Sequence, residues 1–178
     1  MIFINLKMIR ALKTKKGRDE QNLFIMENEK FVLEIPSNIN IVTYVCSEAW
    51  QGRERLTGAP VIVVSEKRFQ SLSDTVTPQG IMAVCEKQSY NLEDMQAGSP
   101  LILICECLSD PGNIGTLIRT AAAAGAAGVI FSAGSGDVYN SKVIRASAGS
   151  LFRIPVTESA DLQEVIPILK QKGNKQLH

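Results

Sequence analysis

The sequence has 178 residues, of which 45% are hydrophobic and 21% charged, and its formal net charge is +1. This composition is typical of one ordinary globular domain or two small ones. No apolar run approaches the roughly 18 residues that a membrane-spanning helix needs. The apolar start, residues 1–4, is not followed by a signal-peptide cleavage pattern. We therefore expect a soluble, cytoplasmic protein with no membrane partner.

Soft metal ligands are few, because the sequence holds four cysteines and one histidine. It has no Cys-x-x-Cys pair, and His178 stands alone at the end. Zinc sites need several closely spaced ligands, so we expect no metal site. Cys105 and Cys107 are two residues apart in a predicted strand, which would place both on one face as packed thiols. We expect them to be reduced, because cytosolic disulfides are rare.

The first twenty residues contain a basic run with no acidic residue in it: Lys7, Arg10, Lys13, Lys15, Lys16 and Arg18. Lysine and arginine contacts to phosphates dominate the affinity of proteins for nucleic acids. The run therefore suits a phosphate-binding patch. A solvated, flexible N-terminal segment is the alternative interpretation.

Apolar segments and turns alternate from about residue 30 to residue 90. We predict strands at residues 39–46, 59–64 and 81–85, and a short helix at 65–72. The polar stretch 89–100 contains Gly98 and Pro100 and is the best candidate for a linker. These alternating elements predict an α/β fold.

A second α/β segment begins at residue 101. The apolar run 101–108 predicts a buried strand, and the turn residues 109–113 lead into an alanine-rich helix that ends near Gly125. Asn113 is a good N-cap for this helix, and residues 128–131 predict the next strand. Such β-turn-α-β units build parallel sheets covered by helices.

Ligands of open α/β sheets bind beyond the carboxyl ends of the strands, where residues 109–113 and 132–139 would lie. Arg119 follows Gly115 by four residues and shares its helix face. We therefore expect Asn113, Gly115 and Arg119 to converge on one small spot. Spacing alone leaves an alternative open, in which the three are a cap, a packing glycine and a surface charge.

The stretch Asp110-Pro111-x-Asn113-x-Gly115-x-x-x-Arg119-Thr120-Ala121 resembles the first signature motif of the SpoU/TrmH family of RNA 2′-O-ribose methyltransferases, in the SPOUT superfamily. The run Lys142-x-x-Arg145-Ala146-Ser147-x-Gly149-Ser150-x-Phe152-Arg153-x-Pro155 resembles the segment that follows it in that family. The resemblance implies S-adenosylmethionine-dependent 2′-O-methylation of structured RNA, either rRNA or tRNA. It also implies that Arg119 engages the target ribose-phosphate and that Asn113 shapes the site.

A helix over residues 139–148 would carry Lys142 and Arg145 on one face, which suits an RNA phosphate, although a solvated face is the alternative. Residues 132–137 contain Gly134 and Gly136, but they favour a plain β-to-α connection over a phosphate-binding loop. We further predict a strand at 151–156 and an amphipathic helix at 161–172 with Pro167 inside it.

The N-terminal half resembles the small ribosomal-protein-like α/β domain with which the family holds RNA. The resemblance rests on Lys15-Lys16-x-Arg18, Phe24-x-x-Glu27, Lys30-x-Val32 and the closing stretch 78–84. Asn28 stands where the family usually has glycine. The resemblance implies RNA contacts from Lys13, Lys15, Lys16 and Arg18. It also implies an RNA substrate-binding domain at 1–92, a linker at 93–100 and a partial methyltransferase domain at 101–178.

In this family a C-terminal trefoil knot binds the methyl donor and commonly forms a homodimer. Neither the Gly-Asn-Glu-x-x-Gly-like motif nor the later Ile-Pro-Met run of the knot occurs here. We therefore expect an N-terminal portion with a partial Rossmann-like SPOUT domain, inactive alone and without donor-binding residues of its own. Two alternatives stay open: a non-catalytic RNA-binding protein of the same descent, and an unrelated domain that binds a nucleotide at Gly134–Gly136.

Overall fold

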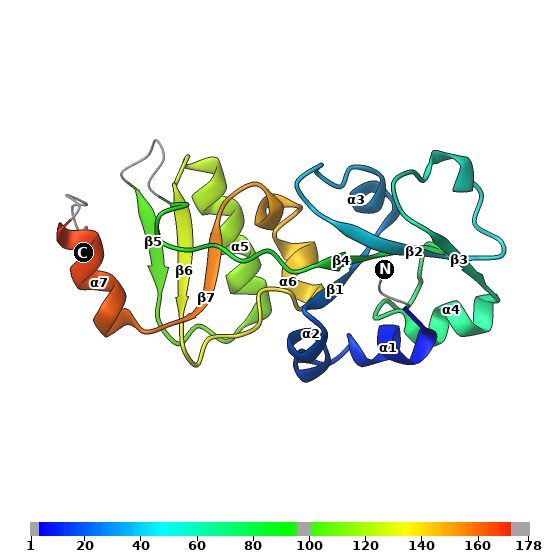
Figure 1. Cartoon of the computed structure of the whole chain (residues 1–178), viewed down its shortest axis with the longest axis horizontal. Helices are drawn as coiled ribbons and strands as arrows, with labels where there is room; N and C mark the ends of the chain where they lie inside the picture. The colour runs from blue at the N-terminus through cyan, green and yellow to red at the C-terminus, as the bar shows by residue number, and fades with distance from the viewer. Residues whose placement is uncertain (1–3, 96–100, 172–178) are drawn as a thin grey trace. The chain divides into compact units, whose positions relative to one another are not determined.

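The computed structural model describes residues 4–95 and 101–171, and Figure 1 shows their helices and strands. The chain divides into two compact units. Unit 1 is the chain up to Gln88 with Tyr139–Ser141, and unit 2 is Ser89–Val138 with the chain from Lys142 onward. Each unit has its own β-sheet, which confirms the predicted α/β fold. No helix within the described residues is long and apolar enough to span a bilayer.

Unit 1 is a four-stranded sheet with short helices. Its strands are β1 (Leu23–Glu27), β2 (Ile41–Ser47), β3 (Val61–Val64) and β4 (Ile81–Glu86), in the order β1-β4-β2-β3. Its helices are α1 (Leu6–Ala11), α2 (Lys15–Gln21), α3 (Glu29–Leu33) and α4 (Glu66–Leu72), with a 3₁₀ turn η1 (Arg53–Arg55). β4 pairs antiparallel with β1 and β2, whereas β3 pairs parallel with β2. The strands predicted at 39–46, 59–64 and 81–85 and the helix at 65–72 are confirmed.

The basic N-terminal run forms helices α1 and α2, so the flexible-segment interpretation is wrong for its described residues. Asn5 and Thr14 cap the two helices, since their side-chain oxygens accept backbone N–H groups of the first turns. Ile9 and Leu12 are buried against Phe69 and other residues of the unit 1 core. Burying a large apolar side chain contributes about 1.5–3 kcal/mol. Core packing therefore fixes the basic segment in place.

Asn28 connects β1 to α3 with a backbone conformation that favours glycine, at φ 102° and ψ 122°. Its side-chain oxygen accepts the Phe31 N–H at 3.4 Å. Holding a residue with a β-carbon in such a region costs about 1–3 kcal/mol. The structure thus accounts for glycine as the usual family residue here.

Asn28→Gly is expected to leave unit 1 as stable as the parent or stabilise it by up to about 1 kcal/mol. The strain is relieved, whereas losing the cap to glycine costs only a few tenths. Asn28→Ala keeps the strain and loses the cap, so it should destabilise by about 1 kcal/mol. Urea unfolding followed by the fluorescence of Trp50, the only tryptophan and a buried residue of unit 1, compares the three proteins. Equal midpoints for the glycine and alanine variants would contradict the strain at Asn28.

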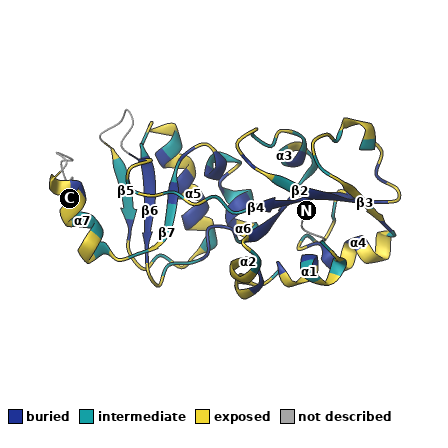
Figure 2. Cartoon of the chain, in the orientation of Figure 1, coloured by how far each residue is buried: buried dark blue, intermediate teal, exposed yellow. Residues whose placement is uncertain are grey.

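Unit 2 is a three-stranded parallel sheet in the order β5-β6-β7. Its strands are β5 (Ile102–Cys105), β6 (Gly128–Ser132) and β7 (Val156–Ala160), and its helices are α5 (Pro111–Ala123), α6 (Ser141–Ala146) and α7 (Leu162–Gln171), with a 3₁₀ turn η2 (Ser150–Phe152). The central strand β6 is buried along its whole length (Figure 2). The predicted β-turn-α-β unit and its parallel pairing are confirmed.

Several predicted boundaries in unit 2 are wrong. The strand predicted at 101–108 ends at Cys105, because Cys107 has a left-handed backbone with φ 49° and is exposed. The strand predicted at 151–156 is mostly the turn η2, and β7 begins only at Val156. Both errors arise where apolar residues lie in a turn, because periodicity does not distinguish a short apolar turn from a strand.

The predicted linker 93–100 lies partly outside the described residues, which exclude 96–100, Gly98 and Pro100 among them. Met95, by contrast, is fully buried in a cluster of unit 2 with Ile130 and Leu169. A β-carbon on Gly128 would meet the Met95 side chain at 2.6 Å. This end of the predicted linker therefore packs into the core of unit 2. The predicted helix 161–172 corresponds to α7, and its residue 172 is not described.

Candidate functional site

Helix α5 begins directly after the loop that follows β5, and its first turn is fixed by Asp110 and Pro111. The Asp110 side chain accepts the Asn113 N–H at 2.8 Å, which makes Asp110 the N-cap. Pro111 occupies the first helical position, where its missing N–H costs nothing. The prediction that Asn113 is the N-cap is therefore wrong. Its backbone is held by the cap, and its side chain is left for another role.

Gly115 packs α5 against α6 and does not open a space for a ligand. A β-carbon at Gly115 would lie 2.5 Å from the Ala146 β-carbon and 2.9 Å from both the Ser147 nitrogen and the Val143 carbonyl oxygen. Ile114 and Ile118 on the same helix are fully buried. The expected convergence of Asn113, Gly115 and Arg119 is thus wrong for Gly115, because the protein itself fills the gap beside it.

Asn113 and Arg119 are both exposed on the side of α5 away from its buried face. Within residues 4–95 and 101–171, neither the Asn113 amide nor the Arg119 guanidinium has a hydrogen-bond or ion-pair partner. An arginine held on a helix with all five N–H donors free is suited to bidentate contact with a phosphate. Asn113 and Arg119 are the amide and the charged side chain of α5, whose other exposed polar residues are Thr116 and Thr120.

The loops after β5 and β6 are tied to each other. The Ser132 hydroxyl accepts the Cys107 N–H at 2.9 Å, and the Gly136 N–H donates to the Leu108 carbonyl at 2.8 Å. A β-carbon on Gly136 would meet the Ile114 side chain at 2.8 Å and the Ser109 carbonyl at 3.0 Å. Gly136 is therefore a packing glycine, like Gly115. The prediction of a plain connection over a phosphate-binding loop agrees with this packing.

Helix α6 is shorter than the predicted 139–148 helix and carries Lys142 and Arg145. Lys142 is exposed, whereas Arg145 is half-buried. One terminal nitrogen of Arg145, Nη1, is enclosed and has no hydrogen-bond partner among the described residues. Contact of either residue with RNA stays a prediction.

The four cations predicted to bind RNA in unit 1 differ in their surroundings. Arg18 is 4% exposed and donates to the Leu12 carbonyl at 2.7 Å. It is therefore part of the α1–α2 packing and is not a surface group that meets phosphates, which corrects the expectation for this residue. Lys16 pairs with Glu20 at 3.7 Å and remains well exposed.

Lys13 and Lys15 are paired with acidic residues as well. Lys13 lies 3.3 Å from the Asp74 carboxylate, and Lys15 lies 3.5 Å from that of Asp19. Burial alone would raise the pKa of Asp19, but its hydrogen bond to Lys87 and the charges of Lys87 and Lys15 hold that pKa below its usual value. Each lysine thus already has a counter-charge. RNA binding by the three lysines stays a prediction.

All four cysteines are free thiols. Burial raises the pKa of Cys85 to about 12 and that of Cys46 to about 11, and Arg53 lowers the latter in part. Cys105 is buried as predicted, but Cys107 is exposed because the strand ends before it. The part of the chain that the structure describes holds no group of three or more metal-ligating side chains.

Two family models match the chain, one in each half. The model for the SpoU rRNA methylase family matches residues 100–177, and the model for the MRM3-like substrate-binding domain matches residues 5–83. The first covers the motif around Asn113 and Arg119. The second covers the basic helices and most of the unit 1 sheet.

Curated relatives agree with both matches. The chain is 36% identical over 168 residues to the 23S rRNA (guanosine(2553)-2′-O)-methyltransferase RlmP of Bacillus subtilis, covering 93% of the chain and 66% of RlmP. It is 32% identical over 179 residues to the mitochondrial rRNA methyltransferase 3 of Xenopus tropicalis, covering 95% of the chain and 43% of that protein. The chain therefore spans less than two thirds of the length of these relatives.

Solved structures show the same fold. The SpoU methyltransferase AviRb from Streptomyces viridochromogenes, in complex with AdoMet, matches 96% of the chain and 68% of its own length, with a TM-score of 0.83 and 24% identity. The AdoMet-bound rRNA methyltransferase from Sinorhizobium meliloti matches 93% of the chain and 64% of its own length, with a TM-score of 0.76 and 30% identity. The fold and the α5 motif thus define an α/β protein of the methyltransferase type. The chain belongs to the SpoU/TrmH family.

Proposed function

We propose that this chain carries the RNA-binding part and the ribose-facing part of an S-adenosylmethionine-dependent RNA 2′-O-ribose methyltransferase. The observation that carries the proposal is the pair Asn113 and Arg119 on α5, which are exposed and have no hydrogen-bond or ion-pair partner among the described residues, within the region that the SpoU model matches. The RNA is ribosomal or transfer RNA. The relatives named as rRNA methyltransferases favour rRNA.

Arg119 would act on the RNA substrate. A ribose hydroxyl is a poor nucleophile, so the enzyme must orient it and help remove its proton. A guanidinium is able to hold the adjacent phosphate with two parallel N–H bonds and to polarise the hydroxyl. It does not serve as a free proton acceptor, because arginine stays charged in proteins. Asn113, whose backbone is fixed by the Asp110 cap, would orient the same nucleotide.

We propose that the pocket for the methyl donor forms only in a longer protein and not in this chain alone. Two glycines at this end of α5, Gly115 and Gly136, pack closely against protein atoms and leave no space for a ligand beside them. We therefore assign no donor-binding residue to this chain. Donor binding is proposed only for the complete protein, by family.

We propose that the two units have different roles in the reaction. Residues 1–92 would hold the RNA, and residues 101–178 would contribute Asn113 and Arg119 to methyl transfer, with a homodimer in the complete protein. We further propose that the chain by itself is inactive. The alternative is a non-catalytic RNA-binding protein of the same family, which the match of residues 5–83 to a substrate-binding domain favours.

The test compares the 178-residue chain with the product of the longest reading frame of its gene. Calorimetric titration measures S-adenosylmethionine binding, and mass spectrometry of nucleosides after incubation with donor and rRNA measures 2′-O-methylation. We expect the longer product to bind donor and to form 2′-O-methylnucleosides, and the short chain to bind RNA alone.

Other outcomes separate the alternatives. If the reading frame ends at residue 178 and its product binds RNA but not the donor, the protein is the non-catalytic RNA-binding alternative. Donor binding by the short chain would overturn our view of where the donor pocket lies. If neither protein binds RNA or donor, the proposed function is wrong.

A further inference from the structure

The cations of the N-terminal basic run and of α4 fall into two groups according to their partners. Lys13, Lys15 and Lys16 pair with carboxylates, and Arg18 is buried. Four other cations on α1 and α4 are exposed and have no carboxylate partner among the described residues: Lys7, Arg10, Lys67 and Arg68. The sequence placed Lys7 and Arg10 in the basic run, but the family motifs carried no RNA contact for any of these four.

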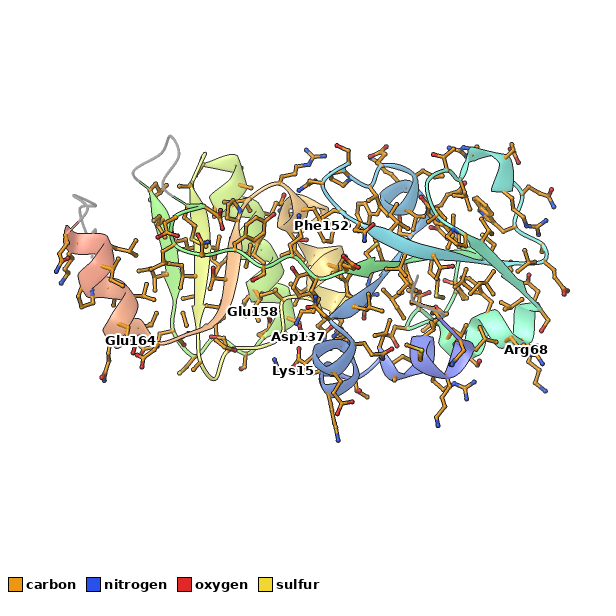
Figure 3. All side chains as sticks on the ribbon, in the orientation of Figure 1. Lys15, Arg68, Asp137, Phe152, Glu158 and Glu164 are labelled. Atoms are coloured by element: carbon orange, nitrogen blue, oxygen red, sulfur yellow. The ribbon has the colours of Figure 1, made fainter. Side chains whose placement is uncertain are left out.

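The four unpaired cations lie on two helices that pack against each other. Arg10 of α1 donates from Nη2 to the Ser71 hydroxyl of α4 at 3.2 Å, and that hydroxyl donates to the Arg68 carbonyl at 2.7 Å. Ser71 follows Lys67 by four residues and Arg68 by three, so all three share one face of α4. Figure 3 shows Arg68 on the outer side of α4, away from the strands.

The remaining charges on these helices do not neutralise the cluster. Helix α1 contains no acidic residue, and Lys7 and Arg10 are three residues apart on it. Glu66, the one acid of α4, accepts the Ala49 N–H at 3.2 Å and points to a different side of the helix from Ser71. Asp74, beyond the end of α4, is paired with Lys13. The positive charges of Lys7, Arg10, Lys67 and Arg68 are therefore not neutralised by acidic side chains of α1 or α4.

We propose that the α1–α4 basic face, formed by Lys7, Arg10, Lys67 and Arg68, is the surface of unit 1 that contacts the phosphates of the RNA substrate. This inference deepens the proposed function and rests on it. A cation that already has a carboxylate partner must give up that ion pair to bind a phosphate, whereas an uncompensated cation releases only counterions from the RNA. Arg10 uses one of its five N–H donors on Ser71 and keeps the others for a phosphate.

The experiment measures binding of the 178-residue chain to a fluorescein-labelled RNA stem-loop at several salt concentrations. The test variant is Arg10→Gln with Arg68→Gln. The matched control is Lys30→Gln with Arg55→Gln, which removes the same charge from exposed positions of α3 and η1 in the same unit. All four positions are exposed, so each substitution should change stability by no more than about 0.5 kcal/mol, which circular dichroism checks.

We expect the test variant to lower the slope of log K against log salt by about 2, one for each lost phosphate contact. Its Kd at 0.1 M salt should rise by at least about tenfold. The control should leave the slope within experimental error of the parent, and adding Lys7→Gln and Lys67→Gln to the test variant should lower the slope further.

Equal losses in the test and control variants would overturn the inference, because the binding would then depend on net charge and not on this face. An unchanged slope in the test variant, with firm binding by the parent, would also overturn it while leaving the proposed function intact. A parent chain that does not bind RNA, and whose gene product forms no methylated nucleoside, would overturn the proposed function itself.

Discussion

Arg119→Ala in the product of the longest reading frame is expected to lower kcat/KM for RNA methylation on the order of a hundredfold or more, because it removes the charged donor that we propose contacts the reacting ribose-phosphate. The guanidinium has no partner among the described residues, so the substitution breaks no contact that supports the fold. Since the side chain is exposed, the free energy of unfolding should change by no more than about 0.5 kcal/mol.

Arg119→Lys separates the contributions of charge and geometry at this position, and Lys170→Ala serves as the control. Arg119→Lys keeps the positive charge but loses the planar fork, so we expect it to recover only part of the activity. Lys170→Ala removes an exposed cation from α7 in the same unit and should leave kcat/KM unchanged. Initial rates of tritium transfer from S-adenosylmethionine to rRNA measure all three. Near-parental activity of Arg119→Ala would show that Arg119 does not act on the substrate.

Gly115→Ala is expected to destabilise unit 2 by about 2 kcal/mol. Its new β-carbon would meet the Ala146 β-carbon and two backbone atoms of the α6 segment, which cannot rotate away. Overpacking of this kind costs about 1–3 kcal/mol. It outweighs the gain in helix propensity from glycine to alanine, which is at most about 1 kcal/mol.

Gly112→Ala is the matched control for Gly115→Ala, because it lies on the same helix and its β-carbon would meet only the Asp110 carboxylate oxygen, at 3.1 Å. We expect it to be nearly neutral. Hydrogen exchange of the β6 amides reports the stability of unit 2, and 2 kcal/mol corresponds to a fall in protection of about thirtyfold. Equal protection in the two variants would show that α5 can move away from α6 at little cost.

The role of Gly115 became clear only from the packing of α5 against α6. Its four-residue spacing from Arg119 suggested that the two meet at one spot, but α6 fills the space beside Gly115. The glycine lets α5 approach α6 closely, and this packing fixes the helix that presents Asn113 and Arg119. The nearest sequence signal for this packing was the Ala146-Ser147 pair in the second motif, whose small residues permit the close approach.

The sequence by itself determined the α/β class, the parallel β5-α5-β6 unit and the family, because strand and helix periodicities and short motifs are local properties of the chain. It also singled out Asn113 and Arg119 as the candidate site residues of α5. The role of Asp110 as the N-cap was readable in principle, since an aspartate followed by a proline is a strong helix start.

Only the tertiary structure decided which cations are available to a ligand. In the sequence, Lys13, Lys15, Lys16 and Arg18 form one basic run, but folding buries Arg18 under α1 and places carboxylates beside the lysines. Folding also brings Arg68 next to Arg10 across α1 and α4, although they are far apart in the chain. Charge compensation depends on distances between elements that are remote in sequence, so composition and motif spacing could not reveal it.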